Sequence, residues 1–226
     1  MSTIYYHPHP PNTDKIENYQ AHPFIDLLYD LEPINPPHTK FKSQMDSCPA
    51  MNIYRNHTYL LRSPVDMELM FNPEKGEWFV QGNMTEEVFD LIVPPGTQSP
   101  YLQLKIYYLF WSEKKTNDKL WMHDVPLHEV KQTPSFYVAS GMIPVGEYTR
   151  NTSIGLILNT DKTTIKIKRG QPLAAFTLVG DSQIKLVKKL PTQKILDTNL
   201  RHFQTPRFCP YYATKTFFSR WLSHES

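Results

Sequence analysis

The segment Tyr101–Trp111, with the sequence YLQLKIYYLFW, decides the fold class of this chain. Aromatic and branched aliphatic side chains dominate it, and these residue types are enriched in β-strands. The polar residues 113–118 follow as a turn. We therefore expect a strand at the centre of a β-sheet.

Shorter segments with strand character surround this one, separated by turn residues about every 8–12 positions. In residues 65–71, Val65, Met67, Leu69 and Phe71 alternate with Asp66, Glu68 and Met70, which is the period of a half-buried strand. Similar patterns predict strands at residues 52–62, 77–81, 88–93, 136–139, 152–158, 163–168, 173–179 and 184–187. Together they predict a mainly-β fold, either a β-sandwich that resembles a jelly roll or a partly closed barrel.

Proline and helix patterns divide the chain into three parts. The 226 residues contain 20 Pro and 8 Gly, and the first 50 residues are repeatedly broken by proline. Because the residue before a proline avoids the α region, we expect residues 1–50 to form an extended lead packed on the core. Residues 51–190 are expected to form the β-domain, and residues 191–226 a C-terminal helical extension with helices at 194–203 and 211–223.

The second predicted helix carries a stripe of large apolar side chains, formed by Phe217, Phe218, Trp221 and Leu222. Phe217 with Trp221, and Phe218 with Leu222, are spaced four residues apart and share one helix face. Such a stripe is too apolar to remain in water. It packs either on the β-domain or on a partner subunit, so a protein partner or self-association is expected.

The charge is divided unevenly along the chain. Residues 1–149 contain 11 Lys and Arg against 18 Asp and Glu, a net of −7, whereas residues 150–226 contain 13 against 4, a net of +9. This division either pairs the two halves within one fold or an oligomer, or attracts an acidic partner or a nucleic acid to the second half. Lys166 and Lys168 on one face of a predicted strand, with Arg169 next to them, are the candidate cationic binding residues; the alternative is an edge strand protected by lysines.

Two pairs of histidines are candidate metal ligands. His123 and His128 flank Pro126 and could converge with Asp124 or Glu129, although a loop gives them no fixed geometry. His7 and His9 could share one side of a strand, with Asp14 as a third ligand, but the prolines after both histidines favour an extended arm instead. Neither pair is strong enough to predict a metal, and no cofactor is expected.

Both cysteines precede a proline, as Cys48-Pro49 and Cys209-Pro210. A thiolate followed by proline can ligate haem iron, and the two could also form a disulfide. Buried structural cysteines at turns are the commoner case, and we expect that role. A nucleophilic role would need a neighbouring base, for which His57 and His202 are candidates in sequence only.

One local segment resembles the deoxyuridine triphosphatase family. The residues GMIPVGEYTRN at 141–151, then SIGLILNT, then IKIKRGQPLAAFTLV carry the resemblance, through Gly141, Ile143, Tyr148, Asn159, Lys168, Gly170 and Ala174. The resemblance implies a β-arch and a nucleotide-handling enzyme. Pro144, however, stands where that family has the carboxylate that activates water, and the family's glycine-rich C-terminal arm and serine–glycine phosphate motif have no counterpart.

The whole chain resembles a family of bacterial and tailed-phage β-proteins that has no assigned function. Cys48-Pro-Ala, Arg62-Ser-Pro-Val-Asp and Arg169-Gly-Gln-Pro-Leu carry this resemblance, which implies a viral or bacterial origin. The common nucleotide-binding, hydrolase and zinc motifs are missing from the sequence. We therefore favour a non-enzymatic interaction or structural module over a nucleotide- or small-molecule-handling enzyme, with nucleic-acid or acidic-partner binding through the basic half as a further alternative.

The N-terminal sequence has neither the basic nor the apolar part of a secretory signal, and the longest apolar run, residues 106–111, is far shorter than the ~20 residues of a membrane-spanning helix. The expected location is the cytoplasm, meaning the host cytoplasm or the virion if the protein is viral, without a membrane association.

Overall fold

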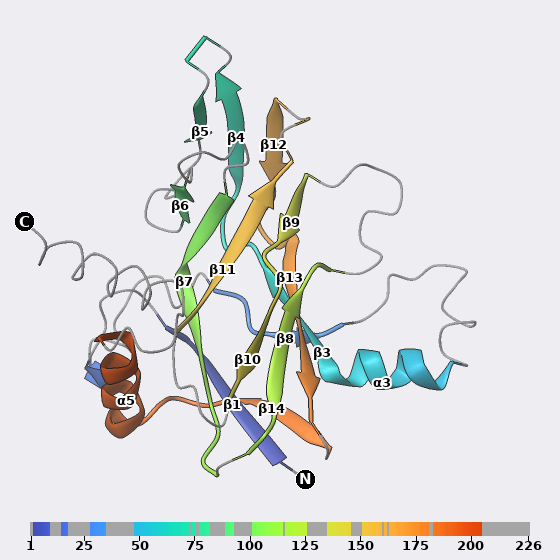
Figure 1. The fold of residues 1–226 in the computed structure, drawn as a ribbon, viewed down its shortest axis with the longest axis vertical. Helices are drawn as coiled ribbons and strands as arrows, with labels where there is room; N and C mark the ends of the chain where they lie inside the picture. The colour runs from blue at the N-terminus through green and yellow to red at the C-terminus, as the bar shows by residue number, and fades with distance from the viewer. Residues whose placement is uncertain are drawn as a thin grey trace, which may run out of the picture.

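The structure, a computed structural model, describes residues 2–9, 15–17, 28–34, 48–72, 74–75, 77–81, 89–92, 101–114, 116–125, 135–145, 151–159, 161, 163–180 and 183–204. Their strands form three sheets (Figure 1). The mainly-β, sandwich-like fold expected from the sequence is confirmed, and the described strands do not close into a barrel.

The first sheet has six strands. Its order is β14 (Ile184–Lys188), β1 (Ser2–His9), β7 (Tyr101–Trp111), β11 (Asn151–Leu158) and β9 (Phe136–Val138), and β6 (Phe89–Ile92) also pairs with β7. The segment that decided the fold class is therefore the middle strand, as predicted. β1 pairs with β14 only through residues 2–6, so Pro8, which has no N–H to donate, faces a described strand on one side only.

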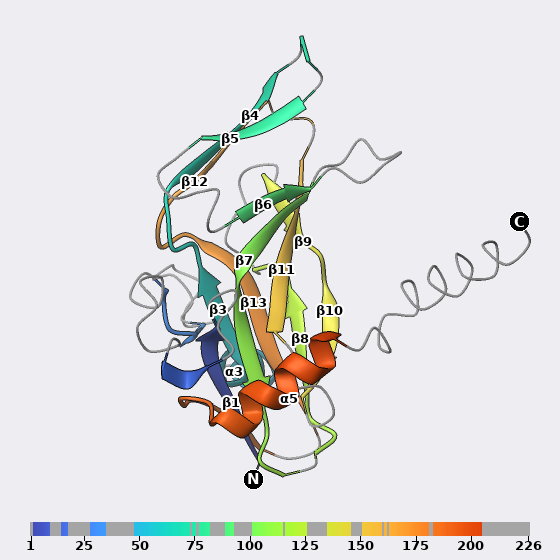
Figure 2. The ribbon, with the colours of Figure 1, turned by 90° about the vertical axis from the view of Figure 1, so that its left-hand side faces the viewer.

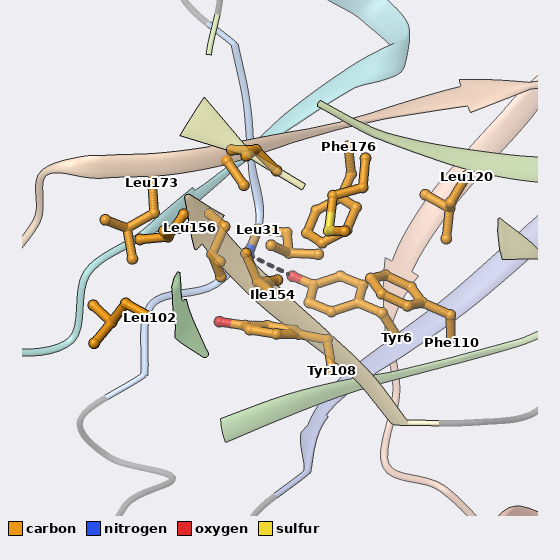
Figure 3. Packing of buried hydrophobic residues seen from close by; sticks show 14 of the residues in the cluster. Tyr6, Leu31, Leu102, Tyr108, Phe110, Leu120, Ile154, Leu156, Leu173 and Phe176 are labelled. Atoms are coloured by element: carbon orange, nitrogen blue, oxygen red, sulfur yellow. Dashed lines mark hydrogen bonds between the residues drawn. The ribbon is translucent and has the colours of Figure 1, made fainter. Parts of the chain in front are cut away.

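The second sheet has five strands and faces the first across the core. Its order is β10 (Gly141–Pro144), β8 (Lys119–His123), β13 (Pro172–Val179), β3 (Thr58–Arg62) and β2 (Glu32–Pro33). Phe110 of the first sheet meets Phe176 of the second with ring centroids 5.2 Å apart, and both are fully buried (Figure 3). This contact between layers is what makes the fold a sandwich.

The third sheet is an arm made of β12 (Thr164–Ile167), β4 (Met67–Asn72) and β5 (Glu77–Gln81). The turn between β4 and β5 lies at one end of the longest axis of the molecule (Figures 1 and 2). Of the residues predicted to face the core, Val65, Met67 and Leu69 are buried, whereas Phe71 is half-buried like Met70, and the strand begins at Met67 rather than at Val65.

Two helices accompany the sheets. α3 (Pro49–His57) contacts β13, β2 and β3 of the five-stranded sheet, whereas α5 (Gln193–Gln204) places Leu196 against Leu109 and Trp111 on the outer face of the six-stranded sheet (Figure 2). The prediction of one continuous strand over residues 52–62 is wrong, since residues 52–57 are helical. Pro49 stands in the first turn, where its fixed φ suits a helix and its missing N–H costs nothing.

Candidate interaction site

A joint connects the arm to the five-stranded sheet. It consists of residues 62–66, from the last residue of β3 to the start of β4, and residues 168–171, between β12 and β13. The amide of Ser63 donates to the Gln171 carbonyl at 2.8 Å, and the amide of Gly170 donates to the Ser63 carbonyl at 2.8 Å. These bonds carry the pairing of β13 with β3 onward into the pairing of β12 with β4. The arm is thus a continuation of β3 and β13, two strands of the five-stranded sheet. Its base is held by these hydrogen bonds at the point where the two strands leave the sandwich.

Side chains reinforce the joint from both segments. The Arg62 guanidinium donates from Nη1 to the Gly170 carbonyl at 2.9 Å, and the Arg169 amide donates to Oδ1 of Asp66 at 2.8 Å. Ser63 is completely buried, and its hydroxyl donates to the Val65 carbonyl at 2.8 Å. Gly170 has a φ of 79°, in the left-handed region that favours glycine. Two of the three motifs that carry the resemblance to bacterial and tailed-phage β-proteins, Arg62-Ser-Pro-Val-Asp and Arg169-Gly-Gln-Pro-Leu, therefore form one structural unit.

A strap, formed by residues 28–34, crosses beside the joint and is held by buried tyrosines. The Tyr108 hydroxyl donates to the Tyr29 carbonyl at 2.9 Å, and the Tyr6 hydroxyl accepts a hydrogen bond from the Leu31 amide at 3.1 Å (Figure 3). Burial raises the pKa of Tyr6 to about 12 and that of Tyr108 still further, so both phenols stay neutral. In the same strap, Glu32 lies 3.5 Å from Nε of Arg62. The strap ties the core of the sandwich to the joint.

The arm has one apolar face and one mixed face. Leu69, Ile165 and Ile167 are buried on the inner face, where Phe71 and Trp78 also meet with ring centroids 5.6 Å apart. On the outer face, Met70 pairs with Phe79, and Phe79 is 44% exposed. The Asn72 side chain accepts hydrogen bonds from the amides of Glu74 and Lys75, which orders the turn at the tip.

The two edges of the arm differ in how they are protected. β12, at one edge, carries Lys166 on its exposed side and is followed by Lys168, which matches the lysine-protected edge considered from the sequence. β5, at the other edge, has the sequence EWFVQ and contains neither lysine nor proline. Among the described strands only β4 pairs with β5. Within the described residues, the other side of β5 therefore has no paired strand, although β6 contacts β5, and the exposed Phe79 ring belongs to this strand.

The candidate cationic residues are not grouped as a free patch. Nζ of Lys166 lies 3.2 Å from Oε1 of Glu68 on the adjacent strand, across the register of β12 and β4. Lys168 and Arg169 lie at the joint, exposed and without an ion pair to any residue that the structure describes. The structure thus places all three on the β12 edge and its turn, and it gives one of them a carboxylate partner.

The uneven charge of the two halves is partly neutralised within the fold. Three ion pairs join a lysine of the second half to a carboxylate of the first: Lys166 with Glu68, Lys188 with Asp30, and Lys189 with Glu113. Lys189 also lies over the Tyr5 ring, 4.5 Å from its centroid. Intramolecular pairing, one of the alternatives considered from the sequence, therefore accounts for part of the charge division.

His123 belongs to a polar cluster beneath α3. Its Nδ1 lies 2.7 Å from the Asp124 carbonyl and must donate to it, so Nε2 of the neutral ring accepts from the Thr177 hydroxyl at 2.8 Å. Thr177 and Thr58 hydroxyls are 2.8 Å apart, and the Tyr54 ring of α3 lies 6.1 Å from the His123 ring. Burial lowers the pKa of His123 and therefore favours the neutral ring.

This arrangement gives His123 a structural role rather than that of a free ligand, because both ring nitrogens are engaged. The Asp124 carboxylate is engaged as well, accepting from the Val138 amide at 2.5 Å. His128 and Glu129 lie outside the described residues. Across the part of the chain that the structure covers, no three His, Cys, Asp or Glu side chains are grouped so that they could hold a metal ion.

The remaining sequence candidates divide between described and undescribed residues. His7 is buried in β1, where its Nδ1 donates to the Pro8 carbonyl at 2.8 Å and burial lowers its pKa. Cys48 is a free cysteine immediately before α3. Cys209, His202 and the aromatic stripe of Phe217, Phe218, Trp221 and Leu222 lie outside the described residues or have undescribed side chains.

The residues that resemble deoxyuridine triphosphatases serve separate local roles. Gly141 and Pro144 begin and end β10, at the edge of the five-stranded sheet. Oδ1 of Asn159, after β11, accepts from the Asp161 amide at 3.0 Å, and Gly170 turns the chain at the joint. Tyr148 lies outside the described residues.

Two exposed apolar pairs were not predicted from the sequence. Trp121 and Met142 are cross-strand neighbours on β8 and β10, exposed by 41% and 54%; Ile157 and Tyr137 are neighbours on β11 and β9, exposed by 40% and 43%. Each pair joins residues from distant segments, and only the strand order brings them together.

Comparison with known proteins adds no relative: no protein family matches the chain, and no curated protein matches it in sequence. Within the described residues, no helix is both long and apolar enough to cross a membrane.

Proposed function

We propose that this chain is a non-enzymatic β-module that works by protein–protein contact, encoded by a phage or another virus as its sequence resemblance suggests. The observation that carries the proposal is the arm: a three-stranded sheet, braced at its base, whose edge strand β5 pairs with only one strand among the described residues. Another protein chain that supplies a β-strand can extend this sheet, because main-chain groups at a free edge pair with any strand of suitable register.

The side chains around β5 support the same role. Phe79 projects from the outer face at 44% exposure next to Met70, and aromatic side chains are frequent anchors of protein interfaces. The opposite edge strand, β12, carries Lys166 and is followed by Lys168, and lysines at an edge disfavour strand addition. A partner would therefore be directed to one edge of the arm rather than to both.

A second copy of this chain is the partner we propose to test first, since it carries the same edge and antiparallel pairing of two β5 strands gives a closed two-fold dimer. Sedimentation of the full chain over a range of concentrations measures self-association. Phe79→Lys places a charge on the arm and should weaken association at least tenfold. Trp121→Lys is the matched control, because Trp121 is similarly exposed but belongs to β8 of the five-stranded sheet and not to the arm, and it should leave association unchanged.

Two results would count against the proposal. Equal effects of Phe79→Lys and Trp121→Lys would show that the arm is not the contact surface. A rise of several degrees in the melting temperature with dUTP or another nucleotide would favour the enzyme alternative, because a ligand that binds the native state stabilises it. A chain that stays monomeric without binding nucleotides would direct the experiment to a different protein partner, sought with a photo-crosslinking residue in place of Phe79.

A further inference from the structure

The outer face of the six-stranded sheet is covered over one half of its length. Leu109 and Trp111, near the end of β7, are buried beneath Leu196 of α5, with Tyr5 and Ile195 at the border of the contact. Figure 2 shows α5 lying across this end of the sheet and not across the end that carries β9. The covered half shows how this face is normally shielded, by apolar side chains of the C-terminal region.

The other half of the same face carries an exposed apolar patch, formed by Ile157 and Tyr137. These residues are paired across β11 and β9, and Ile157 is also opposite Tyr101 of β7. The register places them on the same face as Leu109, because Leu109 and Tyr101 are separated by an even number of strand positions. Gly155 is next to Ile157 on this face and has no side chain, so the sheet surface beside the patch is not covered by a side chain at that position.

The chain that follows α5 has both the composition and the length to cover this patch. It contains the aromatic stripe of Phe217, Phe218, Trp221 and Leu222, for which the sequence predicts one apolar helix face. Twelve residues separate Gln204, the last residue of α5, from Phe217. With residues 211–216 in the predicted helix and residues 205–210 extended, they can span up to ~30 Å. The distance along β7 from Leu109 to Tyr101 is about 26 Å, at ~3.3 Å per residue.

We infer that the aromatic stripe of residues 217–222 seats on the Ile157–Tyr137 patch of its own chain. The other exposed pair, Trp121 and Met142, lies on the outer face of the five-stranded sheet, on the opposite side of the core from α5. A segment leaving α5 must pass around an edge of the sandwich to reach it. Ile157 and Tyr137 lie on the face that α5 already covers in part, and this shared face favours them over Trp121 and Met142.

A double-mutant cycle in the full chain tests this contact. Tyr137→Ser and Trp221→Ser should each lower the melting temperature by about 3–10 °C, the loss expected for uncovering one large aromatic side chain in a chain of this size. Because both substitutions break the same contact, the double variant should lose clearly less than the two separate losses combined. Ile157→Ser should show the same coupling to Trp221→Ser. Trp121→Ser, the matched control, should combine additively with Trp221→Ser.

The possible outcomes are decisive. If the losses in melting temperature caused by Tyr137→Ser and Trp221→Ser are additive, the proposal is wrong. It is also wrong if Trp221→Ser is coupled to Trp121→Ser rather than to Tyr137→Ser. The cycle is repeated at protein concentrations well below those at which the chain associates. Coupling that persists there supports contact within one chain, whereas coupling that disappears on dilution means that the stripe binds a second copy, and the assignment to the same chain is wrong.

Discussion

Gly170 allows a sharp test of how the joint is built. Its φ of 79° lies in the left-handed region, which costs a residue with a Cβ atom roughly 1–2 kcal/mol. A Cβ at this position would lie 3.4 Å from the Tyr29 hydroxyl, an ordinary contact that adds little strain. Gly170→Ala should therefore reduce the free energy of unfolding by about 1–2 kcal/mol, almost entirely through the backbone. For a chain of this length, the melting temperature should fall by about 2–8 °C.

The measurement is thermal and urea unfolding of three variants beside the wild-type chain. Gly170→Asn should lose less stability than Gly170→Ala, because asparagine tolerates the left-handed conformation better than alanine. Gly141→Ala is the control: no heavy atom lies within 4 Å of its added Cβ, and its φ is not in the left-handed region. Its stability should change by no more than about 0.5 kcal/mol. If Gly170→Ala behaves like Gly141→Ala, or if asparagine is worse than alanine, the backbone argument for the joint is refuted.

Two further predictions concern the buried polar groups. Tyr108→Phe removes the hydroxyl that donates to the Tyr29 carbonyl. Because that carbonyl loses its donor, the free energy of unfolding measured in urea should fall by about 1–2 kcal/mol. An unchanged urea midpoint would contradict the role of Tyr108 in anchoring the strap. Burial lowers the pKa values of His7 and His123 in the folded chain. The unfolded chain therefore binds protons more readily than the folded chain as the pH falls. The free energy of unfolding should thus be highest above about pH 6.5 and should decline as the pH falls below that value. His123→Gln should reduce this decline in pH-dependent unfolding, and an identical pH profile would show that His123 does not contribute.

Local patterns predicted most of the strands because burial on one face of a strand leaves a period of two in the sequence. Tyr101–Trp111 and Glu77–Gln81 have the predicted bounds. The pattern failed at α3, where Ile53 and Tyr54 suggested a strand. A helix forms there because Pro49 can begin one and because Tyr54 then packs over His123. Tertiary contact, which a local pattern does not contain, decides such a segment.

The candidate site could be predicted only in part, since it depends on contacts between distant segments. Arg62 and Gly170 are 108 residues apart in the sequence, yet they share a hydrogen bond at the joint. The motifs around them were recognisable, but their mutual contact was not, because nothing local indicates which strands become neighbours. The same reason applies to Ile157 and Tyr137, whose exposure follows from the strand order and from where α5 ends.

The charge division and the shape of the arm are connected. The ion pairs of the second half join exposed side chains, and water screens such pairs strongly, so they neutralise the surface more than they stabilise the fold. The cations that remain without an ion pair among the described residues include Lys168 and Arg169, which follow β12 at the base of the arm. Positive charge at this edge disfavours the addition of a further strand, whereas β5 contains neither lysine nor proline and is the edge to which we propose that a strand is added. Under the proposed function, the basic second half does not require a nucleic-acid partner, because its charges would disfavour a partner strand on the β12 side of the arm.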